Sequence, residues 1–346
     1  MQTWDLDRMG EDTVKEKDNR HRQRIFTILT YVVAIVCMWA VLRHAHWQDF
    51  RSDVREIGWG WVVLAVISNI CAYLCQGWRW TMLLTPIERI PVIRSVQSVF
   101  VGVLASEVLP LKPGEIIRCY LQSRWKDIPF SVTLSSVFIE RFFDGVLLGV
   151  ALIVSLGRTP DMPMEIRVGS WVLVGVLAIG AVLLSIAIFH RERATTALSG
   201  PGWRRHVRVL IHDLHLIGHS RYLYYAAALT IPYLVLQVVP VYASMRAYGF
   251  ADASWGDAAV LTICLRLSTV IPQAPGNVGT FNYITTQILT RVSRYGSDVA
   301  GRFSVLLWIV VTIPLIVVGL VALMFTGTHI RDLHLGAKSE MPAGKV

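Results

Sequence analysis

Ser-Glu-Val-Leu-Pro-Leu-Lys-Pro-Gly-Glu, residues 106–115, follows a long apolar run, and its pattern returns at residues 268–277 as Ser-Thr-Val-Ile-Pro-Gln-Ala-Pro-Gly-Asn. The two copies keep one spacing from the serine through both prolines to the glycine. Two prolines followed by a glycine cannot continue a helix. Each copy therefore predicts a turn between two helical stretches.

The composition around these turns is that of a membrane protein. Hydrophobic residues make up 54% of the 346 residues, charged residues only 16%, and the mean hydropathy is +0.50. In soluble domains, about a quarter of all residues are charged. The net charge of +9 comes from Lys and Arg in short loops between apolar runs, which argues against a nucleic-acid partner. We therefore expect an all-α polytopic membrane protein.

Six apolar runs are long enough to cross about 30 Å of hydrocarbon as helices. They are residues 25–42, 59–84, 131–156, 168–189, 222–248 and 303–325. Basic residues collect on one side of this arrangement, which predicts that both termini lie in the cytoplasm. The expected organisation is a cytoplasmic tail (1–24), a single membrane domain (25–326) and a C-terminal cytoplasmic tail (327–346).

The two Pro-Gly turns are flanked by limbs that are short for a full crossing. The limbs are residues 95–109 and 115–122 around the first turn, and 258–271 and 277–292 around the second. Both pairs are therefore predicted to be re-entrant helical hairpins. Three spans separate them, so they would enter from opposite sides as an inverted repeat, with halves at about 59–157 and 222–326. The alternative is that Pro and Gly are only the turn residues of two loops at the membrane interface.

The run at 131–156 carries charges where few are expected. Its sequence Glu140-Arg141-Phe-Phe-Asp144 places Arg141 about 15 Å into a helix, close to mid-membrane. Spacings of three and four residues put the three charges on one helix face. Each costs at least about 2.5–3.5 kcal/mol at such depth, which favours a functional role. The alternative is a structural ion cluster, for instance Glu115 paired with Arg141.

Further arginines could extend this cluster into a basic track for an anionic lipid headgroup. Arg118 and Arg266 lie in hairpin limbs, and Arg302 begins the last span; snorkelling explains Arg118 and Arg302 equally well. Helix N-termini attract anions, although Glu115 could simply cap its own helix. The turn residues included in the candidate site are Pro110, Pro113, Gly114, Pro272, Pro275, Gly276 and Asn277.

The segment between the fourth and fifth predicted spans has the periodicity of an interfacial amphipathic helix. Arg204, Arg205 and Arg208 on its polar face are expected to contact the anionic cytoplasmic leaflet. Three histidines share a face there, but no carboxylate or cysteine completes a zinc pattern. The sequence has neither a phosphate-binding loop nor a dinucleotide fingerprint, so neither metal nor cofactor is expected.

The paired motifs resemble those of the lysylphosphatidylglycerol synthase transmembrane-region family, whose members are flippase-like. The residues that carry the resemblance are Leu109-Pro-Leu-Lys-Pro-Gly-Glu115-x-x-Arg118, Glu140-Arg141-x-x-Asp144 and Ile271-Pro-Gln-Ala-Pro-Gly276-x-x-Gly279. The resemblance implies a domain of a bacterial-type inner membrane that moves a phospholipid across the bilayer, without the soluble synthase domain. The family's second motif commonly reads Gly-x-x-Glu, whereas Gly279 is followed here by Asn282.

The favoured function is transport of an anionic or isoprenoid-linked phospholipid between leaflets. Arg141 would serve as countercharge, and the Pro-Gly turns would form a backbone cradle. One alternative is a membrane-embedded transferase that uses Glu140, Asp144 or Glu115 as base. Another is a non-transporting partner of a lipid-synthesis enzyme, and a homo-oligomer stays open as well.

Overall fold

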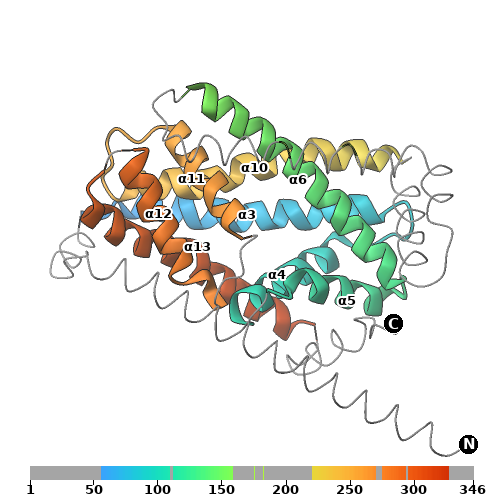
Figure 1. Ribbon diagram of the computed structural model, residues 1–346. Helices are drawn as coiled ribbons and strands as arrows, with labels where there is room; N and C mark the ends of the chain where they lie inside the picture. Colours follow the sequence, from blue (N-terminus) through green and yellow to red (C-terminus); the bar gives the residue numbers. More distant parts are fainter. Residues whose placement is uncertain are drawn as a thin grey trace, which may run out of the picture.

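The computed structural model describes residues 56–109, 112–158, 220–269, 275–293 and 295–326, besides the isolated Gly175 and Val182. All regular structure in these ranges is helical (Figure 1). The first group is α3 (Trp59–Leu84), α4 (Val92–Val108), α5 (Gly114–Lys126) and α6 (Phe130–Arg158). The second group is α10 (Arg221–Ala247), α11 (Trp255–Ser268), α12 (Thr280–Arg291) and α13 (Ser297–Met324), with the 3-10 turn η1 (Pro275–Asn277) before α12. Both groups follow the order long, short, short, long.

Three of the described helices, α3, α10 and α13, are long and apolar enough to cross a membrane. They coincide closely with the predicted spans 59–84, 222–248 and 303–325. The predicted span 131–156 is the 29-residue α6, which carries Glu140, Arg141 and Asp144 near its middle. The predicted spans 25–42 and 168–189, both tails and the segment with Arg204, Arg205 and Arg208 lie outside the described residues.

Local sequence fixes where the short helices begin and end. α11 starts in a capping box, in which the Asp257 N–H donates to Ser254 Oγ at 3.1 Å and the Ser254 N–H donates to Asp257 Oδ2 at 3.1 Å. Pro91 precedes the first residue of α4. Asp127 follows α5 in the left-handed region, with φ of 51°, so the chain reverses there before α6.

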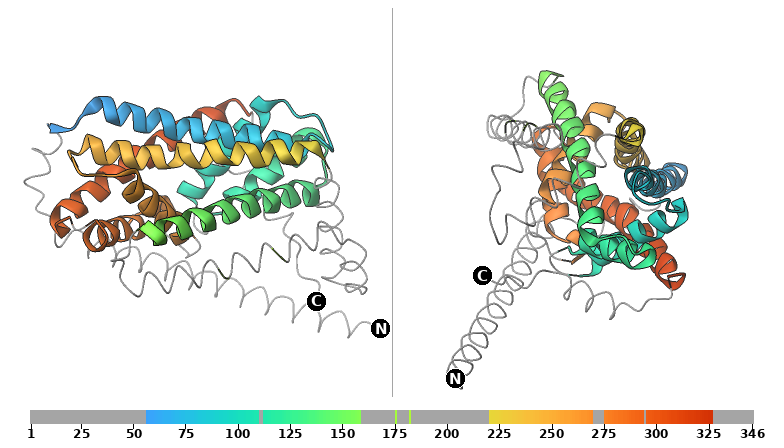
Figure 2. Two further views of the ribbon diagram at one scale, coloured as in Figure 1. Left: turned by 90° about the horizontal axis from the view of Figure 1, so that it is seen from above. Right: turned by 90° about the vertical axis from the view of Figure 1, so that its right-hand side faces the viewer.

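The long helices α3 and α10 lie side by side and run in opposite directions (Figures 1 and 2). The Gly58 N–H at the start of α3 donates to the carbonyl oxygen of Ala247 at the end of α10, at 2.9 Å. In the pair α4–α5, the start of α4 and the end of α5 lie near the C-terminal end of α3. In the pair α11–α12, the start of α11 and the end of α12 lie near the C-terminal end of α10. The two short pairs therefore extend toward each other from opposite ends.

The two short pairs meet at their tips, which are the ends where Glu107 lies in the last turn of α4 and where Asn277 precedes α12. Asn277 Nδ2 donates to both carboxylate oxygens of Glu107, at 3.3 Å each, and so joins the second copy of the repeated motif to the first. Gly276 has φ of 69°, a conformation that glycine adopts without strain, and its carbonyl accepts the Trp308 indole N–H at 2.6 Å. α4 thus holds the second tip through the Asn277 side chain, and α13 holds it through the Gly276 carbonyl.

Glycines let the backbones of neighbouring helices approach α4 closely. A Cβ at Gly114, the first residue of α5, would overlap the carbonyl oxygen of Gly102 in α4. A Cβ at Gly77 of α3 would lie 2.6 Å from Val96, and one at Gly319 of α13 would lie 2.7 Å from Leu104. Small residues at such crossings are typical of helix packing in membranes. They hold α4 against α3, α5 and α13.

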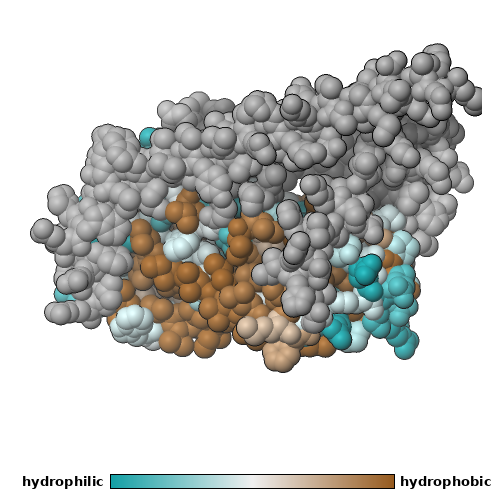
Figure 3. All heavy atoms as spheres, turned by 90° about the horizontal axis from the view of Figure 1, so that it is seen from below, coloured by the Kyte–Doolittle hydropathy of each residue, from teal (hydrophilic) through white to brown (hydrophobic). Residues whose placement is uncertain are grey.

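The outer surface of the described helices is apolar along regular stripes. On α3 the exposed side chains include Trp59, Val63, Ile67, Leu74 and Trp78, and α13 exposes a similar series. In Figure 3, apolar side chains make up much of the coloured area of this face, with more polar residues toward its right-hand end. The buried side of α3 is instead rich in polar residues. This pattern is the one expected of helices that face lipid outside and a polar interior.

Candidate functional site

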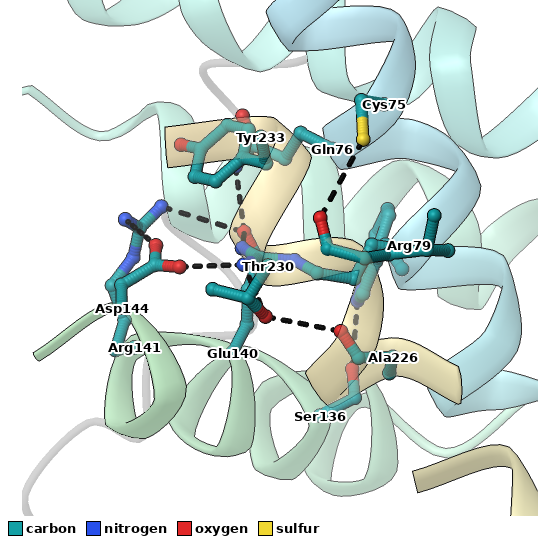
Figure 4. A network of polar contacts seen from close by, with 12 residues as sticks. Cys75, Gln76, Arg79, Ser136, Glu140, Arg141, Asp144, Ala226, Thr230 and Tyr233 are labelled. Atoms are coloured by element: carbon teal, nitrogen blue, oxygen red, sulfur yellow. Dashed lines mark hydrogen bonds and ion pairs between the residues drawn. The ribbon is translucent and has the colours of Figure 1, made fainter. Parts of the chain in front are cut away.

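Six charged side chains from three helices form one ion-pair network. Arg79 comes from α3, Glu115 and Arg118 from α5, and Glu140, Arg141 and Asp144 from α6. Figure 4 shows Arg79 between the α6 carboxylates and the residues of α10. Three arginines balance three carboxylates, so the network as a whole carries no net charge.

Arg79 is the buried centre of the network, with a side-chain exposure of 0%. Its Nη2 lies 3.0 Å from Glu140 Oε1 and its Nη1 lies 2.5 Å from Asp144 Oδ1. Nη1 also donates to Thr230 Oγ1 at 3.1 Å, and the guanidinium lies 4.5 Å from the centroid of the Tyr233 ring. Arg79 therefore joins α3 to both α6 and α10.

Glu140 and Arg118 are the second buried pair. Arg118 Nη2 lies 3.1 Å from Glu140 Oε2, and its guanidinium lies 4.9 Å from the Trp80 ring. Glu140 Oε1 also accepts a hydrogen bond from Gln76 Nε2 at 2.6 Å. Buried charges persist only with such close partners. Arg118 is thus paired in the interior and does not snorkel to an interface.

Arg141 and Glu115 are the open members of the network, with 42% and 44% of their side chains exposed. Arg141 Nη2 pairs with Glu115 Oε1, and Arg141 Nη1 lies 3.2 Å from Asp144 Oδ2. The pair with Glu115 is the contact that the alternative of a structural ion cluster predicted, and the contact with Asp144 follows from the spacing of three residues. Glu115 also pairs with Arg118, at 2.6 Å. The network is closed on the side of α3 and accessible at this pair.

The other two arginines of the predicted basic track have different positions. Arg266 on α11 donates from Nη2 to the Tyr233 hydroxyl at 2.8 Å, and its guanidinium lies 5.3 Å from the ring centroid. It therefore adjoins the network through the same tyrosine that Arg79 contacts. Arg302 lies in the first turns of α13, where its Nη1 is 2.5 Å from Asp298 Oδ2.

The described turn residues have structural contacts of their own. Pro113 precedes Gly114 at the start of α5, and Pro275 and Gly276 form η1 with Asn277. Asn277 contacts Glu107, as described above. Pro110 and Pro272 lie outside the described residues.

Asn282, three residues after Gly279, holds the start of α12. Its Oδ1 accepts the Gly279 N–H at 3.3 Å, and its Nδ2 donates to Ser304 Oγ at 3.2 Å. Gly279 has φ of 87°, which favours glycine at this position. The amide therefore caps α12 and ties it to α13.

The sequence reasoning missed Arg79, Gln76 and Tyr233, and it left Glu107 out of the candidate site. An arginine within a predicted span can mark a functional site, but the tryptophans on either side of Arg79 fit an interfacial anchor equally well. Gln76 lies three residues before it, on the same helix face. Tyr233 gives no such signal, because only the packing of α10 against α3 brings it to the arginines. In the part of the chain that is described, no group of three His, Cys, Asp or Glu side chains could hold a metal ion.

Comparisons with known proteins agree with the resemblance of the motifs. A search of curated proteins gives no match. The model of the family described as lysylphosphatidylglycerol synthase TM region matches residues 27–327. That match covers most of the chain, including all three long apolar helices and the ion-pair network. This protein is therefore a membrane protein that belongs to the lysylphosphatidylglycerol synthase TM region family.

Proposed function

We propose that this protein moves an anionic or isoprenoid-linked phospholipid between the leaflets of a bacterial-type inner membrane. The family supports a role in lipid handling. The observation that carries the proposal is the half-exposed pair of Arg141 and Glu115 at the edge of an otherwise buried ion network. A charged site inside a helical membrane protein usually marks a pathway for a charged or polar substrate.

The network allows Arg141 to exchange its partner at small cost. When a headgroup phosphate replaces Glu115 beside Arg141, Glu115 keeps Arg118 at 2.6 Å. Asp144 likewise keeps Arg79. No carboxylate is left unpaired, so the large penalty of an isolated buried charge does not arise. Arg141 can therefore bind an anion while the rest of the network stays intact.

The proposal includes a topology in which both short helix pairs are re-entrant and enter from opposite sides. Their opening toward opposite ends of α3 and α10 supports it, as does the Glu107–Asn277 contact between the tips. Non-helical backbone at membrane depth is tolerated where protein surrounds it, and the described backbone at Gly114 and Gly276 is packed in this way. Such inverted repeats place a binding site near the midplane in many transporters.

Cysteine labelling tests this topology. In a background without the native cysteines, Asp127→Cys and Gly296→Cys are expected to react with an impermeant maleimide from opposite sides of the membrane. Both positions are exposed and lie at the open ends of the two pairs. Glu88→Cys should label with Asp127→Cys, and Glu56→Cys with Gly296→Cys, because each control lies at the same end of the helices. Labelling of Asp127→Cys and Gly296→Cys from one side would rule out the inverted arrangement.

Reconstitution tests the transport function itself. Purified protein in vesicles that contain a headgroup-labelled anionic phospholipid is expected to bring inner-leaflet label within reach of an impermeant quencher. Protein-free vesicles and vesicles with a labelled cationic lipid are the controls. Exchange no faster than in protein-free vesicles would contradict the proposal. A chemically altered lipid without exchange would favour the membrane-embedded transferase instead.

A further inference from the structure

Arg266 differs from the arginines of the ion network in its partners. Its side chain is partly buried on α11, and its guanidinium contacts the Tyr233 hydroxyl and ring. Within the described ranges, no carboxylate oxygen lies within 4 Å of it, whereas Arg79, Arg118 and Arg141 each pair with at least one carboxylate. Arg266 therefore keeps hydrogen-bond donors and a positive charge for another partner.

The charges of the connected side chains do not balance, and this favours a bound anion. Tyr233 links Arg266 to Arg79, so the described arginines in this group number four, against three carboxylates. One positive charge is left over, and it lies at Arg266. An ionised side chain in a membrane interior costs at least about 2.5–3.5 kcal/mol. A bound anion would offset part of that cost.

Tyr233 adds a second polar group at the same place. The centroid of its ring lies 4.5 Å from the Arg79 guanidinium and 5.3 Å from the Arg266 guanidinium. Its hydroxyl oxygen accepts the Arg266 N–H, which leaves the hydroxyl hydrogen to be donated. The planar guanidinium with several N–H donors, joined by one O–H donor, matches the oxygens of a phosphate group.

We infer that Arg266 and Tyr233 form a second anion position, which binds the phosphate group of the substrate. The inference deepens the proposed function and rests on it. Arg141 binds the headgroup at the α5–α6 edge, and Arg266 binds it beside α11, so the two positions belong to the two halves of the molecule. The recognised chemistry is a phosphate ester, and either a phospholipid or free phosphate could supply it.

Lipid binding to the full-length protein in detergent, followed by native mass spectrometry, tests this position without any need for transport. The wild-type protein should retain phosphatidylglycerol in preference to phosphatidylcholine. Arg266→Gln should weaken phosphatidylglycerol binding by about tenfold or more, because one charged hydrogen-bonding partner is lost. Tyr233→Phe keeps the ring against Arg79 and should cause a smaller loss. Arg291→Gln, an exposed arginine of the same helix pair, should bind like wild type.

Two further measurements distinguish a lipid phosphate from free phosphate and exclude misfolding of the variant. Displacement of the lipid by inorganic phosphate in the wild type, but not in Arg266→Gln, would assign recognition to the phosphate group alone. No displacement would assign it to the lipid. Arg266→Lys keeps the charge and should restore part of the binding. Unchanged lipid retention in a folded Arg266→Gln protein overturns the inference, whereas retention that depends on Arg266 without leaflet exchange overturns only the proposed transport.

Discussion

Glu140→Gln is expected to destabilise the folded protein by about 3–5 kcal/mol, the usual cost of breaking a buried ion pair by removal of one partner. The Glu140 carboxylate is fully buried and lies within 3.1 Å of both Arg79 and Arg118. Without its charge, the two guanidinium groups keep only Asp144 and Glu115 as close anionic partners. Thermal unfolding of the detergent-solubilised protein, followed by tryptophan fluorescence, measures the effect.

The matched control is Glu88→Gln, the same substitution at an exposed site in the loop between α3 and α4. It is expected to change the free energy of unfolding by at most about 0.5 kcal/mol. The double variant Arg79→Gln with Glu140→Gln removes one charge of each sign. Its loss in free energy of unfolding should be smaller than the sum of the losses of the two single variants. If Glu140→Gln unfolds at the same temperature as Glu88→Gln, the network does not stabilise the fold.

Arg141→Gln is expected to fold normally and to exchange lipid between leaflets at least about tenfold more slowly than wild type. The ion pair with Glu115 is half-exposed, and pairs of this kind contribute only about 0–1 kcal/mol to stability. A headgroup phosphate, in contrast, would lose a charge-assisted hydrogen bond that contributes about 1.5–3 kcal/mol. Since about 1.4 kcal/mol corresponds to a factor of ten, binding and exchange should fall at least that far.

Two variants separate the charge of Arg141 from its shape. Arg141→Lys keeps the charge without the planar fork, so it should retain part of the exchange. Arg291→Gln removes an exposed arginine far from the network and should exchange lipid like wild type. The quenching assay in vesicles gives the rates, and the thermal unfolding midpoint shows whether each variant is folded. Wild-type exchange by a folded Arg141→Gln protein would refute the role given to this residue.

Much of the helical framework could be predicted because long apolar runs and prolines act locally. The predicted span 59–84 and α3 share the same bounds, and the short limbs around both turns are helices in the structure. The pairing of Arg141 with Asp144 also follows from a spacing of three residues on one helix. These predictions need no knowledge of how distant segments pack.

The centre of the candidate site could not be predicted in the same way. Arg79 lies between two tryptophans near the end of an apolar run, which is also the pattern of an interfacial anchor. Its burial results from the contacts of α3 with α6 and α10, and these join residues more than 60 positions apart. Arg302 shows the reverse case, since its similar place in the second half pairs it with Asp298, four residues before it on the same helix.

The close approach of Gly102 and Gly114 determines how the first helix pair can move. With backbone packed against backbone, there is no layer of side chains along which α4 and α5 could slide past each other. A displacement of one helix therefore carries the other with it, as a rigid body. Gly77 of α3 and Gly319 of α13 also hold α4 closely, so the pair can shift only together with these two long helices. Such a shift carries the Glu107 and Glu115 carboxylates along together.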